Sequence, residues 1–206
     1  VVVGNGAVDI LRTVSGIFRR IVVCVPCFAE YGRRTSVAGG EVIRLSLDDS
    51  LEVDQEGIAD NLRPGDLLIL GNPNNPTGRR IPEKTLARIH EAILRKNAFL
   101  LLDEAFFEFC PPDYDSVERF RDSGHVCVVR AATKFFALPG IRLGYGFTSA
   151  EFAEEYRKAE NPWSVNAYAN AAGRCIFRDK EYIRRTRENI QREKEYLLHR
   201  LSEIGW

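Results

Sequence analysis

The sequence predicts an α/β fold of three layers, α-β-α, built around a mostly parallel sheet of about seven strands. Three observations predict it. Short apolar segments alternate with segments of helical period along most of the chain. Several of the apolar segments are continuously apolar, as expected of strands that are covered on both faces. The 206 residues are 45% hydrophobic and 28% charged, a composition that supports a substantial core and excludes a disordered chain.

The predicted strands are the short apolar segments. In chain order they cover residues 1–3, 21–25, 42–45, 67–70, 99–102, 126–129 and 143–147. Segments of helical period lie between them, at about 7–18, 29–38, 83–97 and 150–159. Because parallel strands need a long crossover between them, this alternation favours a doubly wound, largely parallel sheet within a single domain.

Residues 180–204 are predicted to form a long amphipathic helix. Its apolar residues recur at spacings of 7, 7, 4 and 3 among arginine, lysine and glutamate: Ile183, Ile190, Leu197, Leu201 and Ile204. Gly205 follows, and glycine commonly ends a helix. We expect this helix to lead towards a further, C-terminal domain. The chain has no Met and opens with three valines, so we expect a fragment that begins within a strand.

Composition narrows the classes of function. Lysine and arginine number 29, and aspartate and glutamate also number 29, so the net charge gives no argument for binding nucleic acid or an anionic membrane. No secretory signal and no apolar segment of about 20 residues is present. An odd count of five cysteines favours reduced thiols and a cytoplasmic location. Cys24 and Cys27 form a C-x-x-C pair without a second pair or a nearby histidine, so a buried thiol is expected and no metal site.

Candidate ligand-binding residues follow the predicted strands, where parallel sheets bind their ligands. Residues 4–9, Gly-Asn-Gly-Ala-Val-Asp, follow the first strand and open a helix. Glycines there let backbone N–H groups approach an anion at the helix N-terminus, although a tight turn also favours glycine. Residues 72–78, Asn-Pro-Asn-Asn-Pro-Thr-Gly, follow the fourth strand. They could form only a loop, but the amide of Asn75 both donates and accepts hydrogen bonds.

Charged residues follow the next two strands. Asp103 ends the fifth strand, where a carboxylate is unfavourable unless it meets a cation or a hydrogen-bond donor. The alternative is that it caps a helix or lies at the surface. Thr133 and Lys134 follow the sixth strand, and Arg142 comes eight residues after Lys134. A lone lysine is usually a solvated surface group, and the alternative is a nucleophile.

One cofactor accounts for the whole set. Pyridoxal phosphate needs a lysine for a Schiff base, a carboxylate beside its pyridinium nitrogen and a cradle for its phosphate. The carboxylate keeps the ring nitrogen protonated, which lets the ring accept electrons from a Cα carbanion. The sequence therefore predicts a pyridoxal phosphate site at the carboxyl edge of the sheet.

Three motifs resemble those of the fold-type I aminotransferase family, class I/II. They are Asn-Pro-Asn-Asn-Pro-Thr-Gly at 72–78, Asp-Glu-Ala-Phe at 103–106 and Thr-Lys-Phe-Phe-Ala-Leu-Pro-Gly-Ile-Arg-Leu-Gly-Tyr at 133–145. The resemblance runs from Gly4 to Trp206 and implies that residues 1–206 form the large, cofactor-binding domain of such an enzyme. It is strongest to the group that contains histidinol-phosphate aminotransferase and threonine-phosphate decarboxylase. Residues 162–166, the turn at 138–140 and Phe106 are more similar to the decarboxylase.

The resemblance implies a role for each candidate residue. Lys134 would hold the cofactor as an internal aldimine and move the proton at Cα, and Asp103 would pair with the ring nitrogen. Asn75 would bind the 3-oxygen of the ring. Phe28 would stack on the ring, unless it is only a core aromatic residue. The phosphate would be held by the backbone N–H groups of Gly6, Ala7 and Val8 together with Thr133 and Arg142.

Two residues depart from the family pattern. Ala131 stands where many relatives have a hydroxyl residue on the phosphate. Phe106 stands where many aminotransferases have a tyrosine, so Asn75 would contact the 3-oxygen alone. The effect of both on cofactor binding stays open.

The resemblance implies an enzyme that acts on a phosphorylated amino acid, most like threonine-phosphate decarboxylase of cobalamin synthesis. One alternative is a histidinol-phosphate-type aminotransferase that transfers an amino group to 2-oxoglutarate. Another is an aminotransferase-like sensor domain of a transcription regulator, which the neutral charge and the lack of a helix-turn-helix segment disfavour. A homodimer is also implied, since relatives build each site from two subunits. Most substrate-binding groups of relatives lie outside the segments matched here.

Overall fold

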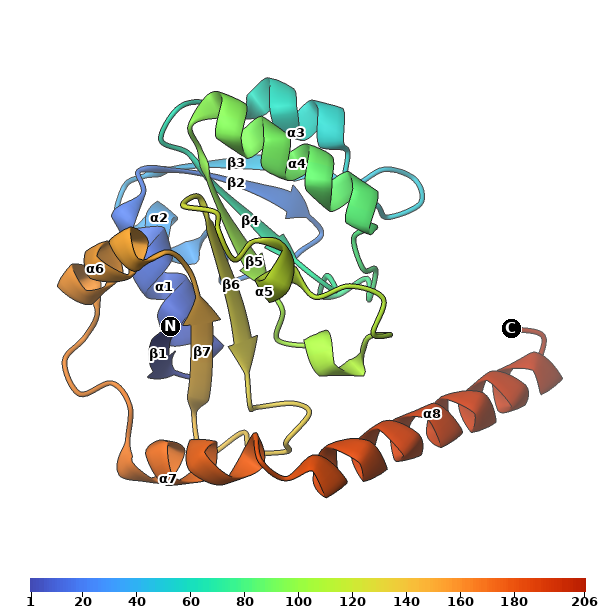
Figure 1. The fold of residues 1–206 in the computed structure, drawn as a ribbon. Coiled ribbons are helices and arrows are strands. Elements are labelled where there is room, and N and C mark those ends of the chain that lie inside the picture. The colour runs from blue at the N-terminus through green and yellow to red at the C-terminus, as the bar shows by residue number, and fades with distance from the viewer.

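Seven strands form one sheet in the computed structural model, which describes residues 1–206 (Figure 1). The strands are β1 (Val2–Asn5), β2 (Arg20–Val25), β3 (Glu41–Ser46), β4 (Leu67–Gly71), β5 (Phe99–Asp103), β6 (Val126–Ala131) and β7 (Leu143–Phe147). Their order is β1-β7-β6-β5-β4-β2-β3. Only β7 runs antiparallel to its neighbours, so the predicted seven-stranded, mostly parallel sheet is confirmed.

Helices cover both faces of the sheet, which confirms the three-layer arrangement (Figure 1). On one face, Ile10 of α1 (Ala7–Ile17) and Tyr156 of α6 (Ala150–Ala159) pack in a cluster with Ile69 and Leu101. On the other face, α3 (Gln55–Asn61) and α4 (Glu83–Lys96) pack on the alternate residues of the same strands. Every residue of β4, β5 and β6 is buried, which explains why the predicted segments 67–70, 99–102 and 126–129 are continuously apolar. Near their carboxyl ends, β5 and β6 also contain Asp103 and Arg130.

Four predicted helices end within a few residues of their observed bounds: α1, α4, α6 and α8 (Lys180–Glu203). The prediction at 29–38 was too long, because α2 covers only Arg33–Val37 and residues 29–32 form turns. Three helices were missed: α3, α5 (Ser116–Arg119) and α7 (Ala167–Ile176), as was the 3-10 turn η1 (Phe107–Phe109). The missed helices begin after side-chain caps at Asp54, Asp115 and Asn166. α3 and α5 are too short, at seven and four residues, to show a helical period.

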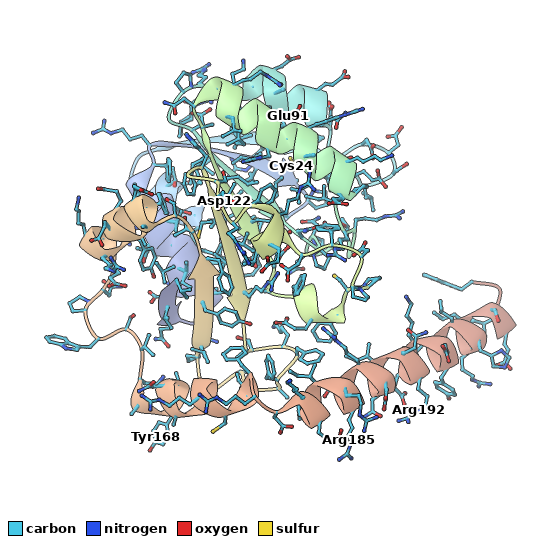
Figure 2. The ribbon with its side chains drawn as sticks, in the orientation of Figure 1. Cys24, Glu91, Asp122, Tyr168, Arg185 and Arg192 are labelled. Carbon is cyan, nitrogen blue, oxygen red and sulfur yellow. The ribbon has the colours of Figure 1, made fainter.

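The long helix α8 extends away from the sheet (Figure 1). Ile183 and Ile190 in its first half pack against a small cluster that contains Phe135 and Phe136. The second half has no buried residue, and Leu197 and Leu201 are exposed. Figure 2 shows Arg185 and Arg192 projecting outward from this helix. A further domain beyond α8 stays a prediction. No helix of the chain combines the length and the apolar character needed to cross a bilayer.

Candidate functional site

The carboxyl ends of β1, β4, β5 and β6 lie at one edge of the sheet, and β7 begins there because it runs antiparallel. The register places Gly71, the last residue of β4, opposite Asp103, the last residue of β5. The loop from β6 to β7 brings Lys134 and Arg142 to the same edge. The topology therefore gathers segments that lie far apart in the sequence.

A cavity of about 180 Å³ lies at this edge. An apolar cavity of roughly 150 Å³ is enough to admit a benzene ring, so a single six-membered ring fits here. The predicted site residues that line the cavity are Ala7, Val8, Phe28, Asn75, Asp103, Thr133, Lys134 and Arg142. Gly6 lies beside it, since a Cβ atom at Gly6 would overlap the guanidinium of Arg142. The structure thus brings together every residue predicted for the site, while their roles remain predictions.

Asp103 is the carboxylate of the cavity. It is only 7% exposed. The backbone N–H of Ala105 donates to its Oδ1 at 3.0 Å, and the Tyr31 hydroxyl donates to its Oδ2 at 3.0 Å. Burial raises the pKa of Asp103, and these two hydrogen bonds oppose that rise. No lysine, arginine or histidine forms an ion pair with it. A buried carboxylate that faces a cavity without a protein cation is suited to a cationic ligand.

The adjacent carboxylate, Glu104, has the opposite environment. Arg130 donates to Glu104 Oε2 from Nε at 3.0 Å and from Nη2 at 2.8 Å. Asn72 Nδ2 donates to Oε1 at 3.2 Å, and the Arg130 guanidinium stacks 3.5 Å from the centroid of the Phe107 ring. Glu104 is therefore fully paired within the chain, which leaves Asp103 as the carboxylate that is free to bind a ligand.

Lys134 supplies the amine of the cavity. It follows β6, its side chain is exposed, and its Nζ lies 5.8 Å from the centroid of the Phe106 ring. Its Nζ has no ion-pair or hydrogen-bond partner in the chain, so the amine is available to a ligand carbonyl. Phe106 and Ala131, the two departures from the family pattern, also line the cavity.

The start of α1 and Arg142 form the anion-binding end. Gly6, with φ of 80°, precedes α1, and the first N–H groups of a helix have no partner within it. The helix α1 is 11 residues long, and its N-terminus favours negative charge. Arg142 is held over it, since its Nη2 donates to the Asn5 carbonyl at 3.4 Å and its Nη1 to the Pro139 carbonyl at 3.2 Å. These donors fit a phosphate group.

Sequence reasoning missed Tyr31 as a site residue. It is 2% exposed, it lines the cavity, and it is the side chain that reaches Asp103. Its ring packs edge-on against Phe28, with centroids 5.7 Å apart and an interplanar angle of 79°. The available signal was weak: a tyrosine three residues after Phe28, in a segment expected to be helical.

The C-x-x-C pair lies outside this cavity. Cys24 is buried in β2, as expected, and both Cys24 and Cys27 are free thiols. Burial raises the pKa of Cys24 to about 12 and also raises the pKa of Cys27. Neither thiol is activated as a nucleophile.

The match to known proteins agrees with this geometry. A family model described as aminotransferase class I and II matches residues 1–206. The chain belongs to this family. Its members depend on pyridoxal phosphate, so family membership implies that cofactor. The residues of the cavity fit it: a free buried carboxylate for a ring nitrogen, an amine for an aldehyde and a helix N-terminus with an arginine for a phosphate.

The relatives of this aminotransferase-family chain include threonine-phosphate decarboxylases and histidinol-phosphate aminotransferases. The threonine-phosphate decarboxylase of Salmonella typhimurium is 38% identical over 99% of the chain and 57% of that relative. The histidinol-phosphate aminotransferase of Clostridium novyi is 30% identical over 99% of the chain and 58% of that relative. The crystal structure of the histidinol-phosphate aminotransferase from Clostridium acetobutylicum superposes with a TM-score of 0.91 at 33% identity, covering 99% of this chain and 62% of that one. The chain thus spans less than two thirds of the length of these relatives.

Proposed function

We propose that this protein is a pyridoxal-phosphate-dependent enzyme that decarboxylates a phosphorylated amino acid, in the manner of threonine-phosphate decarboxylase. The observation that supports it most is Asp103, a buried carboxylate without a cation that shares one cavity with the Lys134 amine and the α1 N-terminus. The higher identity to the Salmonella decarboxylase, 38% against 30% for the Clostridium novyi aminotransferase, favours decarboxylation over transamination.

Each residue has a distinct task in this proposal. When bound, pyridoxal phosphate supplies a ring that withdraws electrons from the substrate Cα. Asp103 would keep the proton on the ring nitrogen, and Asn75 would bind the 3-oxygen. Phe28 would cover a face of the ring. Lys134 would hold the cofactor through its Nζ amine and would carry a proton to or from the substrate Cα.

The phosphate of the cofactor would be held at the start of α1. The N–H groups of Ala7 and Val8, in the first turn of α1, would donate to it, and Thr133 and Arg142 would add side-chain donors. The Gly6 N–H donates instead to the Gly4 carbonyl at 2.8 Å. Donors at this end and Asp103 at the other end would hold the two ends of the cofactor. The two ends together orient the cofactor before substrate arrives.

A second candidate function is a histidinol-phosphate-type aminotransferase. The TM-score of 0.91 to the Clostridium acetobutylicum enzyme favours it. Both functions use the same cofactor residues and differ in which bond at Cα breaks. That choice depends on the groups that bind the substrate carboxylate and phosphate.

The assembly proposed with this function is a homodimer in which residues 1–206 form the large domain and α8 leads to a further domain. Sedimentation analysis of the full-length protein should give twice the mass of one chain. A monomer that retains full activity contradicts the shared site.

An assay of the purified full-length protein separates the two functions. We expect release of CO2 from O-phosphothreonine without any added 2-oxo acid. Formation of glutamate from histidinol phosphate and 2-oxoglutarate, without CO2 release from O-phosphothreonine, would overturn the decarboxylase proposal. Lys134→Ala is the control, because it should abolish either reaction.

A further inference from the structure

Tyr31 is placed to control Asp103. It lies in the turns between β2 and α2, it is almost fully buried, and its hydroxyl donates to Asp103 Oδ2 at 3.0 Å. The backbone N–H of Ala105 holds the other oxygen at 3.0 Å. Each carboxylate oxygen therefore has one fixed donor, and Tyr31 is the only side chain among the two.

Gly71 makes room for that hydroxyl. A Cβ atom at position 71 would lie 3.0 Å from the Tyr31 hydroxyl oxygen and 3.0 Å from the Cα of Asn74. The backbone of Gly71 does not have a positive φ, so its conformation does not require glycine. Gly71 also pairs with Asp103 in the β4–β5 register. Because glycine has no side chain, position 71 leaves space for the Tyr31 hydroxyl to reach the Asp103 carboxylate.

The hydrogen bond has a defined direction. Burial, and then the Asp103 charge, raise the pKa of Tyr31 well above its usual range, so the phenol keeps its proton and donates it. Donation to the ionised carboxylate lowers the pKa of Asp103, against the effect of burial. The other titratable groups near this pair are Glu104 beside Asp103 and Cys27 beside Tyr31. Lys134 and Arg142 line the same cavity.

We propose that Tyr31 is a positioning residue that acts through Asp103 on the ring nitrogen of the cofactor, and that Gly71 provides the space for it. The inference rests on the proposed function for its cofactor. Tyr31 fixes the orientation of the carboxylate and favours its ionised form against the effect of burial, so that it meets a protonated ring nitrogen without rearrangement.

The first test uses the full-length protein after removal of the cofactor. Infrared spectra recorded over a range of pH, with Asp103→Asn subtracted, isolate the carboxyl band of Asp103. We expect Tyr31→Phe to move the midpoint of Asp103 protonation to higher pH. Gly71→Ala should move it in the same direction and add little in the double variant, because both changes remove one hydrogen bond. Tyr156→Phe, a buried tyrosine outside the cavity, should leave the midpoint in place.

The second test measures the affinity for pyridoxal phosphate. Because Asp103 would ionise less readily and be less well oriented without the phenol, Tyr31→Phe should raise the dissociation constant about tenfold, and Tyr156→Phe by less than about twofold. An unchanged midpoint in Tyr31→Phe, or a shifted midpoint without weaker binding, overturns the proposal. If the wild-type protein binds no pyridoxal phosphate, the proposed function fails, while the infrared titration still decides whether Tyr31 controls Asp103.

Discussion

At the scale of single residues, Asp103 and Glu104 show how strand geometry divides two adjacent carboxylates. Glu104 pairs with Arg130 inside the protein, whereas Asp103 faces the cavity. Glu104 directly follows β5, and its backbone N–H still donates to the Val129 carbonyl of β6 at 2.7 Å. Successive side chains of extended backbone point to opposite faces, so these two neighbours in sequence meet different surroundings. The same two residue types would be indistinguishable on a mobile loop.

Asp103→Asn should reduce activity by at least about 100-fold, because an amide cannot hold a proton on a ring nitrogen as a carboxylate does. The same substitution should not lower the stability of the cofactor-free protein. The pKa of Asp103 is raised by burial, so in the cofactor-free protein the ionised form is disfavoured in the folded state. That penalty grows as the pH rises through the raised pKa and disappears at lower pH.

Thermal unfolding of the cofactor-free proteins tests the direction of this pH dependence. At pH 8 the Asp103→Asn variant should unfold at the same temperature as the wild type or higher, and any gain should vanish in acid. A variant that is much less stable at pH 8 but fully active would contradict both parts.

Lys134→Ala should remove the visible-edge absorbance of bound pyridoxal phosphate, since no other lysine lines the cavity. Lys180→Ala is the matched control, because Lys180 is an exposed lysine at the start of α8. Spectra before and after borohydride reduction, followed by peptide mapping, locate the attachment. A reduced adduct on the Lys134→Ala protein would refute the assignment.

At the scale of elements, the Glu104–Arg130 pair joins β5 to β6 and extends to Asp115, which Arg130 Nη2 contacts at 2.6 Å at the start of α5. This network holds the carboxyl edge of the sheet in register. Burial raises the pKa of Glu104, and the Arg130 charge opposes that rise. Without the arginine, Glu104 would be a buried carboxylate with no cation beside it.

Arg130→Met should lower the free energy of unfolding by about 3 kcal/mol, since it leaves a buried carboxylate without its partner. Arg184→Met, which breaks exposed pairs on α8, should change it by less than about 0.5 kcal/mol. Urea unfolding of both variants measures the difference. Equal effects would show that the buried pair contributes no more than a surface one.

At the scale of the whole molecule, the sheet and its two helical layers form the cofactor-binding body, and α8 projects from it (Figure 1). The first half of α8 packs through Ile183 and Ile190, but the second half exposes Leu197, Leu198 and Leu201. A helical segment without tertiary contacts is only marginally stable in water.

Hydrogen exchange should therefore be fast at residues 194–203 of the 206-residue chain and slow in α4, which buries Leu86, Ile89 and Ile93. The proposed further domain predicts that residues 194–203 become protected in the full-length protein. Equal protection of α4 and the end of α8 in the 206-residue chain would contradict this description.

The sequence by itself determined the seven strands, the long helices and the identity of the candidate cofactor residues. These features depend on local periodicity and on motifs that are contiguous in the chain, such as the one at 72–78. It could not predict α3 and α5, because one or two turns of helix are specified by a cap rather than by a repeated apolar pattern.

Only the tertiary structure decided which of the two carboxylates is free and that Tyr31 reaches it. The contact joins residues 72 positions apart, and it exists because the β4–β5 register places the bare backbone of Gly71 beside Asp103. Such a contact is set by strand order and by the space between side chains. No single segment of the chain specifies the strand order or that space.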